Sequence, residues 1–192
     1  LSPLRGIGNY AFYNCSGINS VQFGNGLATL GNYAFGRCIS LQSATLVQQT
    51  GDGGTTGASL GTLGAGAFYG CEKLTSFVVP YSVSEIGDFC FKDCMGLEEV
   101  TLTLDEKAGS GSSLEKIGYR AFEGCSALKK LVLPHSYKGA EGGSNKGGVS
   151  DKPDAEVGGN VFHLSTVKGC TSLEFIKTFD RNIKFVSDAP QA

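Results

Sequence analysis

The stretch Ile7-Gly-Asn-Tyr-Ala-Phe-Tyr-Asn-Cys15 decides the architecture of this 192-residue chain, because the same pattern returns along it. Each copy has an aliphatic residue, a glycine, two variable residues, Ala-Phe, two more variable residues and a cysteine. Further clean copies begin at Leu30, Leu63, Ile86 and Ile117. A stretched copy begins at Val157 and reaches its cysteine only at Cys170. A repeat of this kind predicts a solenoid, in which every unit packs on its neighbours.

The shortest spacing between copies is 23 residues, and insertions of 10, 8 and 17 residues follow the second, fourth and fifth copies. This period is typical of leucine-rich repeats, which pair one strand with a helical or irregular return. We therefore predict an α/β repeat solenoid of the leucine-rich-repeat class that forms a single domain over residues 1–192. The repeats start near residues 7, 30, 63, 86, 117 and 157, and a terminal cap covers about 179–192.

A second pattern, L-x-x-L-x-L, follows each cysteine and predicts one strand per repeat, because its end alternates with period two. These segments are 18–23, 41–46, 74–79, 97–102, 128–133 and 173–178. One phenylalanine per copy is expected to form an aromatic spine between the turns. Its members are Phe12, Phe35, Phe68, Phe91, Phe122 and Phe162. The glycine after the first aliphatic residue suits a turn with unusual backbone angles.

The combined pattern, I-G-x-x-A-F-x-x-C-x-x-L-x-x followed by alternating apolar residues, resembles the Treponema-type, or BspA-like, leucine-rich repeat. Two copies also carry the closing proline of that repeat, Pro80 and Pro134, and the resemblance covers about residues 4–179. It implies an elongated, curved solenoid with a parallel sheet on its concave side. It also implies adhesion or protein binding at the surface of bacteria or protists, so that an extracellular or cell-surface location is favoured.

Composition limits the possible partners. The net charge is −2, from 16 basic and 18 acidic residues, which gives no broad attraction to nucleic acid or anionic lipid. No apolar run approaches the 18 or so residues of a membrane span. The first residues lack the features of a signal peptide and read like the tail of an earlier repeat. Either a leader has been removed or the chain is an excerpt.

Three glycine-rich insertions follow predicted strands and should project from one rim of the solenoid. They are residues 48–57, 104–111 and 136–152. Insertions on one side of a repeat protein often form a binding face. Alternatively they are tolerated slack, because lengthening a flexible loop costs little closure entropy.

Six of the seven cysteines occupy the repeat position, one in each copy, and Cys90 replaces the alanine of the fourth copy. Such cysteines are expected to form a buried ladder of free thiols that pack as small apolar groups. Disulfides between adjacent rungs remain the alternative, since these rungs approach the distance that a disulfide requires. No Cys-x-x-Cys pair or Cys/His cluster suggests a metal, and no cofactor is predicted.

Nothing in the sequence indicates catalysis, so no catalytic residue is predicted. The two histidines, His135 and His163, lie in no nucleophile motif and are assigned as a loop residue and a half-buried packing residue. The glycine-rich stretch 139–148 lacks the strand and helix that flank a phosphate-binding loop.

If the concave sheet binds a partner, the contacts are the variable positions of its strands. The candidates are Gln22, Thr45, Val78, Glu98, Glu99, Thr101, Lys129, Lys130, Val132, Phe175 and Lys177. The adjacent Glu-Glu and Lys-Lys pairs are close enough to pair across strands, in which case they simply satisfy one another on a solvated face. Phe175 is either an aromatic anchor for the partner or a packing residue under the cap.

These features favour a non-enzymatic protein–protein interaction module that acts in cell-surface adhesion. The alternative is a structural or accessory subunit that docks in a larger multiprotein assembly. In both cases the partner is a protein, whose identity the sequence does not specify.

Overall fold

The computed structural model describes residues 4–24, 26–46, 60–102, 114–132, 155–157, 160–162, 164–173, 175–177 and 182–184. The three predicted rim insertions and both histidines lie outside these ranges, and so does most of the predicted cap.

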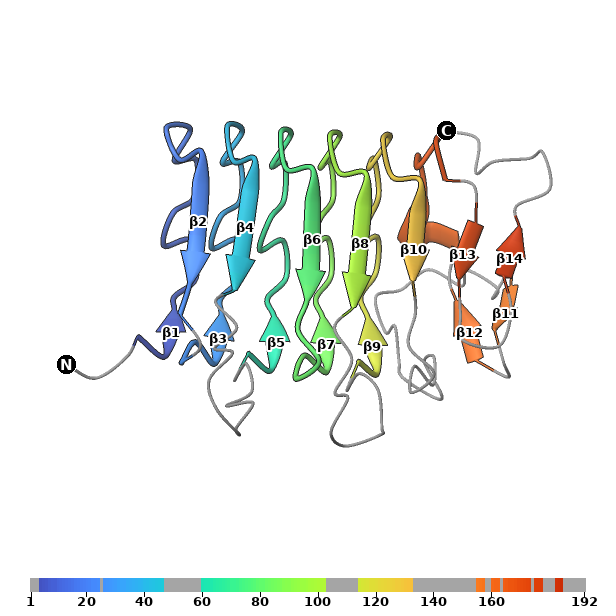
Figure 1. The fold of residues 1–192 in the computed structure, drawn as a ribbon, viewed down its shortest axis with the longest axis horizontal. Helices are drawn as coiled ribbons and strands as arrows, with labels where there is room; N and C mark the ends of the chain where they lie inside the picture. The colour runs from blue at the N-terminus through green and yellow to red at the C-terminus, as the bar shows by residue number, and fades with distance from the viewer. Residues whose placement is uncertain are drawn as a thin grey trace, which may run out of the picture.

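Two sheets run along a solenoid (Figure 1). The larger sheet contains β2 (Ser20–Phe23), β4 (Ser43–Leu46), β6 (Ser76–Val79), β8 (Glu99–Leu102), β10 (Lys130–Val132), β13 (Phe175–Lys177) and β14 (Asn182–Lys184). The smaller sheet contains β1 (Gly6–Ile7), β3 (Thr29–Leu30), β5 (Thr62–Leu63), β7 (Glu85–Ile86) and β9 (Lys116–Ile117). All their pairings are parallel except that of β13 with β14, so the predicted repeat solenoid is confirmed.

The sequence pattern left open whether the returns between the strands are helical or irregular. In the structure they are irregular. They consist of successive turns, and the only helix in the described part of the chain is a 3₁₀ turn, η1 (Leu164–Val167). In the first copy, Tyr10 and Asn14 both have left-handed backbone angles, with φ of 58° and 62°. Equivalent residues of the next four copies do the same. Two left-handed residues four apart interrupt any right-handed helix, which explains the tight return.

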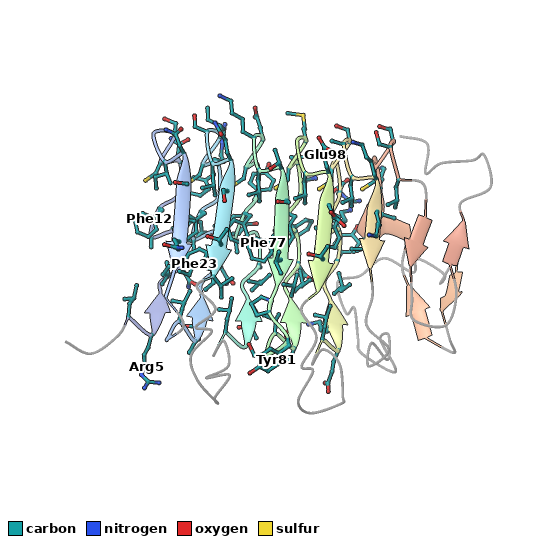
Figure 2. The ribbon with its side chains drawn as sticks, viewed as in Figure 1. Arg5, Phe12, Phe23, Phe77, Tyr81 and Glu98 are labelled. Atoms are coloured by element: carbon teal, nitrogen blue, oxygen red, sulfur yellow. The ribbon has the colours of Figure 1, made fainter. Side chains whose placement is uncertain are left out.

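The aromatic spine lies between the returns and the larger sheet. The rings of Phe12, Phe35, Phe68, Phe91 and Phe122 stack in order, with neighbouring centroids 4.9–5.9 Å apart. The last four rings are fully buried, whereas Phe12 at the first turn is 39% exposed. Phe23 and Phe77 pack against the spine from the strands (Figure 2). The predicted spine is therefore confirmed for the first five copies.

The sixth return has a different register from the one expected. Val161 and Phe162 were assigned to the Ala-Phe positions, but the Phe122 amide donates to the carbonyl of Thr166, as the Phe91 amide does to Ala121. Thr166 and the fully buried Val167 therefore occupy the Ala-Phe positions, three residues before Cys170 as in every other copy. The expected phenylalanine lies instead in β12 (Asn160–Phe162), which pairs antiparallel with β11 (Ala155–Val157). A return of fixed geometry cannot absorb the extra residues before Cys170.

The role of the repeat glycine also differs from the expectation. None of Gly31, Gly64 and Gly87 has a left-handed φ. Each instead lies against the backbone of the preceding copy, where a side chain does not fit. A Cβ built on Gly64 would lie 2.5 Å from the carbonyl carbon of Gly31, and one on Gly31 would lie 2.6 Å from the amide nitrogen of Asn9. These glycines are required because successive backbones approach closely.

Gly64→Ala is expected to lower the free energy of unfolding by about 3 kcal/mol or more, because the backbone of two copies must separate to admit the methyl group. Urea unfolding followed by circular dichroism measures this loss. Gly8→Ala is the matched control, since a Cβ at Gly8 meets nothing within 4 Å. Its stability should change by less than about 1 kcal/mol. Equal losses in the two variants would contradict the close-approach explanation.

Candidate functional site

The strands of the larger sheet alternate between buried and solvent-facing residues, as predicted. In β6, for example, Phe77 and Val79 are buried while Ser76 and Val78 are exposed. Gln22 and Thr45 are exposed at the position equivalent to Val78, and Thr101 is half-buried there. Together these residues form a polar outer surface, the sheet face, on which Val78 is an apolar side chain with 46% exposure.

The charged candidates on the sheet face pair with one another. Lys129 Nζ lies 2.7 Å from Glu98, and Lys130 Nζ lies 3.2 Å from Glu99. Glu98 lies near the end of β8 at which the strand begins (Figure 2). The predicted cross-strand pairing is thus confirmed, and a partner that used these four side chains would have to compete with these ion pairs.

The remaining candidates are placed by their backbone alone. Val132 ends β10, and Phe175 and Lys177 lie in β13, where Lys130 aligns with Phe175 and Val132 with Lys177. β14 lies within the predicted cap and pairs antiparallel with β13 as an additional strand.

A second surface, on the returns, was not predicted. Four tyrosines from the first three copies form a continuous cluster of rings, which we call the tyrosine surface: Tyr10, Tyr13, Tyr33 and Tyr69. The rings of Tyr10 and Tyr33 stack with centroids 5.3 Å apart, and Tyr69 meets Tyr33 edge-on at 6.1 Å. Tyr10 is 57% exposed and Tyr13 is 39% exposed, so this cluster faces solvent.

An open hollow of about 420 Å³ lies on the tyrosine surface and is lined by its four rings together with Phe89 and Lys92. Two glycines make room for the tyrosine rings. Gly36 is buried against the ring of Tyr13, and Gly66 is buried against the ring of Tyr33. The rings therefore cover positions at which the neighbouring copy has no side chain.

The lining of the hollow carries little net charge. Lys92, its charged lining residue, donates to Glu123 at 2.6 Å. Burial opposes the charge of Lys92, but the hydrogen bond and the negative charge of Glu123 raise its pKa above the ordinary value. Burial, together with the neighbouring tyrosines, also raises the pKa of Tyr33, so its phenol remains a hydrogen-bond donor at neutral pH.

The sequence pattern treats the residues on either side of Ala-Phe as variable, and it pointed to the strands and the rim insertions as the places of contact. The available signal was the aromatic character of those positions, which hold tyrosine or phenylalanine in several of the first four copies. The sequence pattern did not show that these aromatic residues meet across copies, because the two glycines that accommodate the rings belong to other repeats.

The cysteine ladder has a specific bonding pattern. Each thiol from the second copy onward donates to the carbonyl of the spine residue one copy earlier: Cys38 to Phe12, Cys71 to Phe35, Cys94 to Phe68, Cys125 to Phe91 and Cys170 to Phe122, at 3.0–3.1 Å. All seven cysteines are free thiols. Alanine would leave the volume of the sulfur atom empty and would offer no donor, so packing and these bonds together give a physical reason for cysteine at this position.

A thiol reagent such as 5,5′-dithiobis(2-nitrobenzoate) is expected to modify one cysteine rapidly in the native protein and all seven after unfolding. Cys15 is half-buried, whereas the other six are buried. Burial raises the pKa of Cys170, for example, to about 12, so that almost no reactive thiolate is present at neutral pH. In Cys15→Ser the rapid phase should disappear. Rapid modification of several thiols in that variant would show that the ladder is accessible.

Within the described ranges, no group of three or more His, Cys, Asp and Glu side chains is placed to hold a metal ion. No helix in that part of the chain has the length and hydropathy needed to cross a bilayer.

Comparison with known proteins agrees with this geometry. Residues 2–103 and 51–142 match the family described as the BspA type leucine rich repeat region, with six copies. The chain belongs to this family. The recognition made from the Ala-Phe and cysteine pattern is therefore confirmed, and no curated protein sequence is detectably similar to the chain.

Two solved structures relate this BspA-type solenoid to longer proteins. A leucine-rich repeat protein from Bacteroides ovatus is 32% identical, with a TM-score of 0.53 over 69% of this chain and 32% of that protein. The pneumococcal vaccine antigen PcpA is 24% identical, with a TM-score of 0.57 over 70% of this chain and 31% of that protein, and shows the shared fold alone. The chain thus matches about a third of the length of each.

Proposed function

We propose that this BspA-type solenoid is a non-enzymatic protein-binding module whose principal contact is the tyrosine surface. Membership of a leucine-rich-repeat family supports a protein-binding role. The single observation that carries the proposal is the cluster of four tyrosine rings around a solvent-accessible hollow.

Aromatic side chains in this arrangement are suited to binding. Tyrosine is enriched in the parts of interfaces that contribute most to affinity, because it offers a large contact area and loses little conformational entropy. Ring contacts with neighbouring copies already hold Tyr33 and Tyr69 in place before a partner arrives. Such preorganisation lowers the entropic cost of association.

The sheet face is proposed as a secondary contact. Its predicted residues are Gln22, Thr45, Val78, Glu98, Glu99, Thr101, Lys129, Lys130, Val132, Phe175 and Lys177. Val78 supports this assignment, because it is apolar and 46% exposed. The Glu98–Lys129 and Glu99–Lys130 pairs add polar groups to this face, although exposed ion pairs of this type contribute little energy by themselves.

The proposed setting is adhesion at a cell surface. A second candidate is a structural or accessory subunit of a larger assembly. The native mass of the protein as isolated from its source distinguishes these settings, because a particle of fixed stoichiometry would establish the second.

Selection from a library of random peptides displayed on phage tests the proposed contact. We expect peptides that bind the wild-type chain at least tenfold more tightly than a Tyr33→Ala/Tyr69→Ala double variant whose fold is verified by circular dichroism. Tyr81→Ala is the matched control, because Tyr81 lies between β6 and β7 and outside both proposed surfaces (Figure 2), and this variant should bind the same peptides with unchanged affinity. Failure to select any ligand, or selected ligands that bind the double variant equally, would contradict the proposal.

A further inference from the structure

We propose that Tyr10 and Tyr33 form an oxidative modification site, at which a haem peroxidase supplied with hydrogen peroxide joins the two rings as a dityrosine. The cross-link connects the first and second copies of the repeat. This inference goes beyond the function proposed above and does not depend on the identity of a partner. It is carried by the relative orientation of the rings, by their exposure and by the burial of the thiols that compete for the oxidant.

The orientation of the rings selects one pair of tyrosines. The unpaired electron of a phenoxyl radical occupies the π system, whose lobes extend above and below the ring plane, so two radicals bond most directly when their rings stack face to face. Tyr10 and Tyr33 are stacked in this way, with centroids 5.3 Å apart and planes 7° from parallel. The other contacts in the cluster are edge-on, with interplanar angles of 74° for Tyr10–Tyr13, 79° for Tyr13–Tyr33 and 73° for Tyr33–Tyr69.

The solenoid holds the selected pair together before any reaction. The Tyr10 amide donates to the carbonyl of Asn32 at 2.8 Å, so the backbone of Tyr10 is fixed against the residue that precedes Tyr33. Two groups held in this way react as one molecule rather than by encounter, which favours a bond within the chain over a bond between chains. Tyr10 is 57% exposed, which leaves its ring room for the movement that the new bond requires.

Other oxidisable groups compete poorly with these phenols. Thiols would reduce tyrosyl radicals, but six of the seven cysteines are buried and Cys15 is half-buried. The chain has no tryptophan. Met95 is 49% exposed, but a thioether is converted to its sulfoxide by oxygen transfer rather than by loss of one electron. One-electron oxidation is therefore directed to the exposed phenols.

The reaction balances with hydrogen peroxide as the oxidant. Each phenol loses one electron and one proton as its O–H bond breaks. The two radicals form a carbon–carbon bond between positions next to the phenol oxygens, and the hydrogens on those carbons then move to the oxygens. Two phenols and one hydrogen peroxide thus give one biphenol and two water molecules. The product chain is lighter by two hydrogen atoms.

Treatment of the purified protein with a haem peroxidase and hydrogen peroxide tests the inference. We expect a monomeric product that has lost two hydrogen atoms and shows the blue fluorescence of a biphenol, with a yield per chain that does not depend on protein concentration. Trypsin releases both tyrosines in one peptide, 6–37, because no Lys or Arg lies between Arg5 and Arg37. In tandem mass spectrometry, fragments from backbone cleavage between Tyr10 and Tyr33 should be missing from this peptide.

Two conservative variants separate stacking from mere proximity. Tyr10→Phe keeps the ring but removes the phenol, and it should abolish the monomeric cross-link. Tyr13→Phe is the matched control, because Tyr13 is exposed in the same cluster but meets Tyr33 edge-on, and its yield should equal that of the wild-type chain. Both variants and the reference carry Cys15→Ser, which removes the half-buried thiol.

A cross-linked monomer that Tyr10→Phe retains would overturn the inference. So would a loop that ends at Tyr13, or a product consisting of covalent dimers alone. Absence of any biphenol in the protein, while free tyrosine added to the same solution is oxidised, would also overturn it.

Discussion

Above about pH 9 the free energy of unfolding is expected to fall by about 7 kcal/mol for each further pH unit. The cause is the buried thiol ladder. Burial raises the pKa of five cysteine thiols well above the ordinary value of 9.0: Cys71, Cys90, Cys94, Cys125 and Cys170. In this range the folded chain keeps protons that the unfolded chain has lost, so the unfolded state binds fewer protons and stability decreases as pH rises.

Below the unfolded pKa the contribution of these thiols to stability is fully present, and it is lost as the pH rises toward the folded values. Each cysteine contributes a slope of about 1.4 kcal/mol per pH unit. Because a domain of this size is stable by about 5–15 kcal/mol, one to two pH units should unfold it. Urea unfolding monitored by circular dichroism at a series of pH values, with a reductant present, measures the slope.

A Cys71→Ala/Cys125→Ala variant provides the control for this slope. It is expected to be less stable at every pH, since two thiol–carbonyl bonds are lost. Its slope, however, should fall by about two fifths, because only three of the five strongly shifted thiols remain. A urea midpoint that does not move between pH 8 and pH 10 in the wild-type chain would show that the thiols are not desolvated in the folded state.

Phe91→Ala is expected to lower the free energy of unfolding by about 3–5 kcal/mol. The Phe91 ring is fully buried and stacks on Phe68 at 5.4 Å and on Phe122 at 5.4 Å, so its removal leaves a cavity at the centre of the spine. Units of a solenoid depend on their neighbours, so the loss should affect the whole cooperative unit. Equilibrium unfolding in urea, with the slope compared as well as the midpoint, measures the effect.

Phe12→Ala is the matched control for the spine. Phe12 occupies the same repeat position and stacks on Phe35 at 4.9 Å, but it is 39% exposed. Its replacement should cost well under half as much as that of Phe91, since less apolar surface leaves a buried environment. If Phe12→Ala and Phe91→Ala lowered the free energy of unfolding equally, the burial of a spine ring would not determine its contribution to stability.

The fold could be predicted from the sequence because the repeats share one pattern of apolar, glycine and cysteine positions. Apolar alternation in segments such as 74–79 predicted the strands, and β6 at Ser76–Val79 shows that alternation in its burial. The Ala-Phe pairs predicted the spine, and the Glu98–Glu99 and Lys129–Lys130 pairs predicted the ion pairs across β8 and β10. In all three cases, equal positions in successive copies must lie side by side once the chain coils.

Other features depended on which part of a neighbouring copy a residue contacts. The repeat glycines are required by the approach of a preceding backbone, and Gly8, with the same sequence context as Gly64, does not meet one. In the sixth return, Thr166 and Val167 occupy the Ala-Phe positions because they lie at the usual spacing before Cys170. Val161 and Phe162 resemble the Ala-Phe pair more closely in sequence, but they lie too far from that cysteine.

The sequence alone therefore determined the repeat, its strand register and the spine, because these follow from a period within one chain segment. Tertiary structure decided the tyrosine surface. Tyr13 covers Gly36 and Tyr33 covers Gly66 only because the solenoid places different copies in contact. The arrangement of these rings depends on the glycines of one copy as much as on the tyrosines of the copy before it. Only the stacking of the copies brings each tyrosine against its glycine.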